Sequence, residues 1–160
     1  MKRTLDRYLD DRLGQGRAYV TKAEAMKALG LSANAFAASA ARMIRRNRLA
    51  GPKQGFYLIL RAEDRSAGGP DPARWIDPLM HHLGVDYRIS LLRAAAFHGA
   101  SHQAAQVFQV IVPKQLRAIA IDRQRIQFVY QAPEAFETVN QPPRLDQMKT
   151  DAVFAKGLLT

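Results

Sequence analysis

Three local signals between residues 21 and 32 leave few folds open to the first third of this chain. Thr21 and Glu24 stand three positions apart ahead of an apolar helical run, which is the spacing of a helix capping box. Gly30 can adopt the left-handed conformation that ends a helix in a sharp turn, and Ser32 is a favoured N-cap for the next helix. Two helices joined by so short a glycine-containing turn are typical of a helix-turn-helix.

The second of these helices is predicted over residues 33–47, and its side chains divide into two faces at 100° per residue. Its apolar side chains share one face, which we expect to be buried: Phe36, Ala40, Met43 and Ile44. The opposite face is small and polar near its start and cationic near its end: Asn34, Ala38, Ala41, Arg42 and Arg45. Such a surface suits a helix whose first turns enter a major groove while its last turns meet phosphate.

The segments on either side of the two helices complete a predicted winged helix-turn-helix domain over residues 1–62. A further helix over residues 4–13 and a small strand within residues 17–20 are expected ahead of the pair. Behind it, a hairpin is expected, with strands over residues 48–50 and 56–60 and a turn at Gly51–Gly55. The tip of this hairpin, the wing, carries Lys53 and Gln54.

Charge is concentrated in the same part of the chain. Residues 1–65 contain 14 Lys and Arg against 6 Asp and Glu, a net charge of +8, whereas residues 66–160 contain 10 against 8, a net of +2. No acidic residue occurs between Glu24 and Glu63. This distribution is typical of a module that binds nucleic acid. Two alternatives stay open, because basic residues late in a helix also suit the helix dipole and winged-helix folds also dock proteins.

The remainder of the chain predicts a second, smaller domain. Residues 63–73 are rich in Gly, Pro and charged residues and are expected to be a linker. Residues 74–160 are expected to form an α+β domain in which helices come first and antiparallel strands follow. The helices are predicted over residues 75–83 and 87–98, the strands over residues 107–113 and 126–131, and residues 116–121 and 134–139 suit either structure. The predicted fold class is therefore α+β throughout.

Composition argues against several functions. The chain has no cysteine, so it can form neither a disulfide nor a thiolate metal site. Neither a signal peptide nor a membrane-spanning stretch is evident, which predicts a cytoplasmic protein. His98 and His102 are four positions apart, but Gly99 interrupts the helix that would bring them together. No phosphate-binding loop or catalytic pair stands out, so we expect no enzymatic activity, no cofactor and no metal.

A longer run in the second half carries a family resemblance. Tyr87 to Lys114, YRISLLRAAAFHGASHQAAQVFQVIVPK, resembles the second-domain hallmark of the AbiEi antitoxin family, in which an aromatic-led helix ends in a His-Gly pair before a polar loop and a strand. The helix-turn-helix and the run Gly55-Phe56-Tyr57 match the N-terminal domain of that family. The resemblance covers about residues 4 to 150.

Membership would imply a transcriptional autoregulator from a bacterial type IV toxin–antitoxin or abortive-infection locus. Such a protein binds inverted repeats in its own promoter, as double-stranded DNA, and is expected to be a monomer in solution or a dimer on DNA. Its functional partner would be a nucleotidyltransferase toxin, with no stable complex required. The alternative is a protein-interaction module whose winged domain docks a partner such as the toxin.

Carried over position by position, the resemblance places the DNA-binding role on these residues: Ser32, Asn34, Ala38, Arg42, Arg45, Arg46, Lys53 and Gln54. Members of the family usually continue with further helices from a segment that would begin here near Asp151. The second domain is therefore expected to be truncated at its C-terminus.

Overall fold

A computed structural model describes residues 3–67, 69–89, 107–139, 145–150 and 153–158. The chain divides into two compact units, Met1–Asp71 and Pro72–Thr160, here called unit 1 and unit 2. The division between them falls within residues 63–73, the segment expected to be a linker. Each unit is described by itself.

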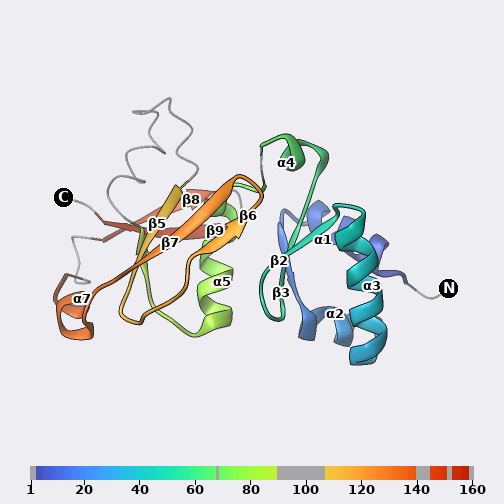
Figure 1. Ribbon diagram of the computed structural model, residues 1–160, viewed down its shortest axis with the longest axis horizontal. Helices are drawn as coiled ribbons and strands as arrows, with labels where there is room; N and C mark the ends of the chain where they lie inside the picture. Colours follow the sequence, from blue (N-terminus) through green and yellow to red (C-terminus); the bar gives the residue numbers. More distant parts are fainter. Residues whose placement is uncertain (1–2, 68, 90–106, 140–144, 151–152, 159–160) are drawn as a thin grey trace. The chain divides into compact units, whose positions relative to one another are not determined.

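Unit 1 combines helices with a small antiparallel sheet (Figure 1). Its elements follow in the order α1 (Leu5–Gly14), β1 (Tyr19–Thr21), α2 (Lys22–Leu29), α3 (Ala33–Arg45), β2 (Leu49–Lys53), β3 (Phe56–Ile59) and α4 (Ala62–Ala67). The strands lie in the order β1-β3-β2, so that β3 is hydrogen-bonded to both neighbours.

The local signals in the sequence set the ends of α2 and α3. The capping box is present, because the Thr21 hydroxyl accepts from the Glu24 backbone N–H while the Glu24 carboxylate accepts from the Thr21 N–H. Gly30 is left-handed at φ 62°, which ends α2, and the Ser32 hydroxyl caps α3 by accepting from the backbone N–H of Ala35 at 3.2 Å. Only three residues, 30–32, therefore separate the two helices.

The C-terminus of α3 also has a specific cap, which shortens the helix relative to the predicted 33–47. Asn47 is left-handed at φ 56°. Its backbone N–H donates to the carbonyl of Ile44, and the N–H of Arg48 donates to the carbonyl of Met43 at 2.8 Å. These two bonds form a Schellman motif, in which asparagine takes the place that glycine usually has.

The core of unit 1 lies between the helices and one face of the sheet. Its buried members are Leu5, Tyr8, Leu9, Val20, Ala25, Leu29, Phe36, Ala40, Met43, Leu49 and Ile59. The prediction that Ile44 belongs to this core is wrong, since its side chain is 43% exposed. Ile44 lies about 80° around the helix axis from Phe36, at the edge of the buried sector, and Met43 fills the core position in that turn.

The β2–β3 hairpin is compact. Its turn has two residues, Gln54 and Gly55, and Gly55 adopts φ 76°. An irregularity between Ala50 and Lys53 places two residues of β2 opposite one of β3, as in a β-bulge. The ring of Tyr57 on β3 meets Phe36 of α3 edge to face, with 5.6 Å between the ring centroids. The hairpin is therefore packed directly against α3.

Helix α4 occupies the first half of the segment expected to be a linker. Asp64, which is 3% exposed, accepts a hydrogen bond from the Arg61 backbone N–H at 2.9 Å and two more from the Arg61 guanidinium at 3.1 Å each. An acidic residue that accepts from the backbone just ahead of a helix stabilises its first turn. A short 3-10 helix, η1 (Pro72–Arg74), begins unit 2, with Pro72 and Ala73 buried.

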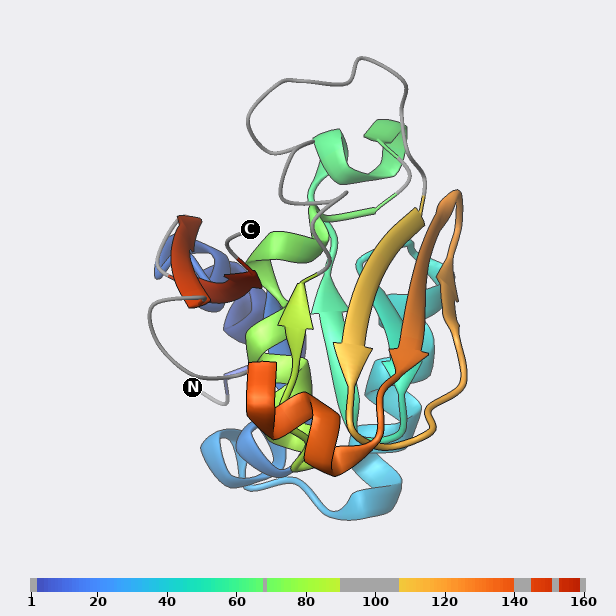
Figure 2. The same cartoon turned by 90° about the vertical axis from the view of Figure 1, so that its left-hand side faces the viewer.

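In the described residues of unit 2, six strands form one sheet in the order β6-β7-β5-β4-β9-β8. After η1 its elements are α5 (Ile76–Leu83), β4 (Arg88–Ile89), β5 (Val107–Val112), β6 (Ile119–Ile121), β7 (Gln124–Tyr130), α7 (Pro133–Val139), β8 (Leu145–Thr150) and β9 (Val153–Leu158). Three strand pairs are antiparallel, as expected, while β5–β7 and β4–β9 are parallel. Figure 2 shows β5 and β7 running in the same direction, with β4 opposed to them. The predicted α+β class is confirmed, and the sheet is mixed.

Several expected elements of unit 2 differ in the structure. The helix predicted over residues 87–98 is wrong at its start, because Arg88 and Ile89 pair with β5 as a strand; residues 90–106 lie outside the described part. The two segments left open are resolved, one as the strand β6 and the other as the helix α7. Strands β8 and β9 were not predicted. Among the described residues, no helix is both long enough and apolar enough to cross a membrane.

Candidate nucleic-acid interface

The outward face of α3 is open to solvent. Of the residues assigned to DNA contact, those on and next to this helix are all exposed: Ser32, Asn34, Ala38, Arg42, Arg45 and Arg46. In the hairpin, Gln54 is exposed and Lys53 is half-buried. The structure therefore gathers six of the eight predicted residues on one helix and its two ends, with the other two at the hairpin tip.

Four of the exposed side chains form a line along α3. Asn34, Ala38, Ala41 and Arg45 recur at spacings of four, three and four, and all lie opposite the buried Phe36. The line is about 16 Å long at 1.5 Å per residue. It therefore offers an amide, two methyl groups and a guanidinium in that order. Arg42 lies beside it and donates a hydrogen bond to Ser39 Oγ at 3.1 Å.

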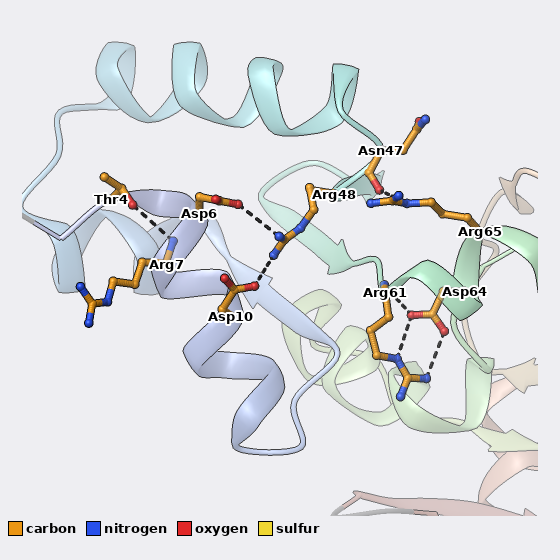
Figure 3. Close-up of polar contacts among 9 residues, drawn as sticks. All are labelled: Thr4, Asp6, Arg7, Asp10, Asn47, Arg48, Arg61, Asp64 and Arg65. Atoms are coloured by element: carbon orange, nitrogen blue, oxygen red, sulfur yellow. Dashed lines mark hydrogen bonds and ion pairs between the residues drawn. The ribbon is translucent and has the colours of Figure 1, made fainter.

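The carboxylates of residues 1–65 are neutralised by arginines that lie outside α3. Arg48 ion-pairs with both Asp6 and Asp10, one turn apart on α1, at 3.2 and 2.7 Å (Figure 3). Arg61 pairs with Glu63 and Asp64 at 3.4 and 3.1 Å. These two arginines thus bind four of the six acidic side chains found in residues 1–65.

The two remaining acids of this region are paired as well. Arg3 pairs with Asp11 on α1. Arg12 pairs with Glu24 at 3.3 Å, donates to the Tyr19 carbonyl at the same distance, and lies over the Tyr19 ring. None of the four arginines in these pairs lies on α3. All six carboxylates are therefore held on α1, α2 and α4 by arginines from other elements or from the adjoining loops.

Most cations of unit 1 remain without such a partner. Within residues 3–67, these have no carboxylate within 4.0 Å: Arg7, Arg17, Lys22, Lys27, Arg42, Arg45, Arg46, Lys53 and Arg65. Arg65 instead donates its Nε–H to the carbonyl of Asn47 at 3.1 Å, at the C-terminal end of α3 (Figure 3). Unpaired charge of one sign creates a potential that attracts polyanions. On α3 it is found in the last two turns, where the helix dipole also favours a cation.

Two further lysines were not part of the sequence-based assignment. Lys22 and Lys27 lie on α2, and Lys27 is exposed. In DNA-binding helix-turn-helix proteins the first helix crosses the phosphate backbone, so these two positions are further candidates for phosphate contact. The backbone N–H of Lys22 donates to the Gly55 carbonyl at 2.9 Å, which fixes the hairpin tip beside the start of α2. Their position in the first helix of the predicted helix-turn-helix was the sequence feature that could have identified them as candidates.

Unit 2 contains a small groove of about 210 Å³ between α5 and the residues that follow it. The Tyr87 hydroxyl donates to Asp77 Oδ1 at 2.8 Å, and His81 Nδ1 lies 3.4 Å from Asp77 Oδ2. His81 is followed directly by His82, and the side chain of His81 is exposed. No group of three or more potential metal ligands occurs in the described ranges, and His98 and His102 lie outside them.

Among the residues of unit 2 whose burial is described, the most deeply buried charged group is Arg88, at 1% exposed. It donates to the Phe136 carbonyl at 2.8 Å and to the side-chain oxygen of Gln131, and its guanidinium carbon lies 4.2 Å from the centre of the Phe136 ring. Burial lowers the pKa of Arg88, while the charge of Asp86 opposes that shift. These contacts hold α7 against β4.

Comparison with known proteins adds no assignment: the chain matches no protein-family model, and no curated protein matches it significantly. The functional inference therefore depends on the geometry and charge described above, together with the sequence resemblance.

Proposed function

We propose that unit 1 is a winged helix-turn-helix that binds double-stranded DNA in a sequence-specific manner, with α3 in the major groove and the β2–β3 hairpin beside it. One observation carries the proposal: all six carboxylates of residues 1–65 are engaged by arginines outside α3, while the outward face of α3 displays unpaired cations. A surface that only contacts solvent does not require carboxylates to be kept apart from unpaired cations. A polyanion does, because carboxylates at the contact would repel it.

Each side chain then has a distinct role. Asn34, in the first turn of α3, suits bidentate contact with the N6 and N7 positions of adenine. Arg42 and Arg45 can contact guanine or phosphate, and Arg46 and Lys53 suit phosphate. Ser32 keeps the first turn of α3 in place through its cap. Gln54 at the hairpin tip is placed to meet the sugar–phosphate backbone.

We propose further that the chain acts as a transcriptional autoregulator, the antitoxin of a type IV toxin–antitoxin pair, with a nucleotidyltransferase toxin as its functional partner. Support for this finer assignment comes from the resemblance carried by residues 87–114, of which 90–106 lie outside the described part. A bacterial autoregulator binds a promoter in the cytoplasm, which agrees with the expected cytoplasmic location. DNA binding by unit 1 does not depend on this assignment.

The second candidate function is docking of a partner protein on the same helix. Ile44 favours it, because an exposed isoleucine at the edge of a cationic face is also what a protein-binding surface presents. The two functions predict different behaviour in salt. A DNA complex weakens steeply as salt rises, whereas a protein complex formed around an apolar anchor survives high salt and nuclease treatment.

The test is a gel shift of the full chain on duplexes selected from random sequence, with Asn34, Arg42 and Arg45 replaced together by alanine. The matched control replaces Gln15, Arg7 and Arg17, which removes the same charge and one amide from exposed positions outside α3. We expect the first variant to lose the shift and the control to keep it, with both folded by circular dichroism. An unchanged shift for the α3 variant would contradict the proposal.

A further inference from the structure

The exposed side chains of α3 are apolar at some positions and polar or charged at others, and this difference affects which bases they can contact. Ala37, Ala41 and Ile44 are all exposed and recur at spacings of four and three along one side of the helix. Ala38 lies beside them on the central line. Arg42 lies on the opposite side of that line, and Arg45 at its end. The middle of α3 therefore presents the methyl groups of Ala37, Ala38 and Ala41, and Ile44 adds an apolar side chain to the last turn, between Arg42 and Arg45 in sequence.

We propose that the DNA site of this chain carries thymines whose C5-methyl groups pack against Ala37, Ala38, Ala41 and Ile44; this inference depends on the DNA-binding function proposed above. Thymine is the only base that offers a methyl group in the major groove, and apolar side chains are its ordinary partners there. The half-site would then hold A·T pairs opposite the middle and the last turn of α3, with an adenine near Asn34.

The exposure of Ile44 gives this inference its specificity. Ile44 is 43% exposed in the last turn of a cationic helix, where contact of its apolar surface with water is unfavourable. Contact with a thymine methyl group would bury apolar surface of both the side chain and the base. Cytosine, by contrast, presents an amino group whose usual protein partner is a carboxylate. Residues 25–62 contain no acidic side chain, so no carboxylate of this segment can accept from that amino group.

The test replaces thymine with deoxyuridine, one position at a time, in a duplex selected from random sequence by the full-length protein. This change removes one methyl group and keeps the base pair. We expect the affinity to fall about fourfold at each contacted thymine, which corresponds to the transfer free energy of one methyl group. Placing 5-methylcytosine, paired with guanine, at a contacted position should bind more tightly than cytosine there.

Ile44→Ala provides the second arm. For this variant, at least one thymine should lose its sensitivity to deoxyuridine while the others keep theirs. The matched control is Val129→Ala, because Val129 in unit 2 is 40% exposed and its truncation removes a similar apolar surface. Control and wild type should give the same deoxyuridine profile.

The outcomes separate the two proposals. If no duplex is enriched or bound, DNA binding itself fails. If a duplex is bound tightly but every deoxyuridine substitution is neutral, DNA binding stands and the thymine inference is overturned. A profile that is sensitive in the wild type but unchanged by Ile44→Ala would remove Ile44 from the contact and leave only the alanines.

Discussion

The two units use arginine in opposite ways. In unit 1, four arginines outside α3 pair with the six carboxylates of residues 1–65. The arginines on α3 are different ones, and their side chains are exposed to solvent. In unit 2, Arg88 is buried and is held by neutral acceptors, a backbone carbonyl and a glutamine side chain, with an aromatic ring beside it. A buried guanidinium whose two terminal nitrogens already donate within the protein is part of the structure, whereas an exposed one without a carboxylate is available to a ligand.

Helix α3 is held in unit 1 by its inner face, and its outer face is open to solvent. Phe36 tests this arrangement, because it is 1% exposed and packs edge to face on Tyr57. We expect Phe36→Ala to lower the free energy of unfolding of unit 1 by about 3–5 kcal/mol. Urea denaturation followed by far-ultraviolet circular dichroism measures this loss. The neighbouring exposed Ala37→Ser should change it by less than about 0.5 kcal/mol.

A smaller effect is expected for the buried arginine of unit 2. Arg88→Met keeps much of the volume but leaves the Phe136 carbonyl and the Gln131 side chain without their donor. We expect unit 2 to lose about 2–4 kcal/mol of stability. Trp75, the single tryptophan of the chain, is fully buried in unit 2 and reports its unfolding by fluorescence. Arg125→Met, at an exposed position on β7, is the control, and equal midpoints for the two variants would refute the structural role of Arg88.

Apart from the controls, the smallest change in stability is predicted for the ion pairs that link Arg48, just before β2, to α1. Arg48→Met releases Asp6 and Asp10, which are half exposed, so the stability cost should be about 1 kcal/mol. The released carboxylates should nevertheless weaken DNA affinity, because they add uncompensated negative charge to unit 1. Adding Asp6→Asn and Asp10→Asn to Arg48→Met should restore the affinity. If the triple variant binds DNA no better than Arg48→Met, the pairing of Asp6 and Asp10 does not contribute to DNA affinity.

The elements of unit 1 could be predicted because their signals are local. The Thr21–Glu24 box, left-handed Gly30 and the Ser32 cap each act within a few residues of their own position, and all three are observed. Ile44 could not be placed correctly by periodicity, since a residue at the edge of a helical face is buried or exposed according to what packs beside it. The sequence also did not reveal α4, which begins at Ala62 and continues into the expected linker, and whose first turn is stabilised by Asp64 and Arg61.

Unit 2 was harder to predict because its structure depends on pairings between distant segments. Arg88 and Ile89 lie in a run with helical periodicity, yet they pair with Ile111 and Val110 as a strand. Ile89 also pairs with Gly157 in β9, a partner that no local pattern indicates. For the candidate interface, the sequence predicted the residues of α3 and the excess of positive charge. It could not show that every carboxylate of residues 1–65 would be paired elsewhere, because the partners Arg48 and Asp10 are 38 positions apart.

The most direct test of the central claim is the salt dependence of affinity for one selected duplex, measured for two charge-matched pairs of substitutions. One pair, Arg45→Ala with Arg46→Ala, removes cations from the end of α3; the other, Arg7→Ala with Arg17→Ala, removes exposed cations elsewhere in unit 1. The logarithmic slope should become shallower by about 1.8 for the first pair, at about 0.9 per phosphate, and should stay unchanged for the second. Equal slopes for both pairs would show that net charge alone drives binding, and would contradict the assignment of α3 as the DNA-contacting helix.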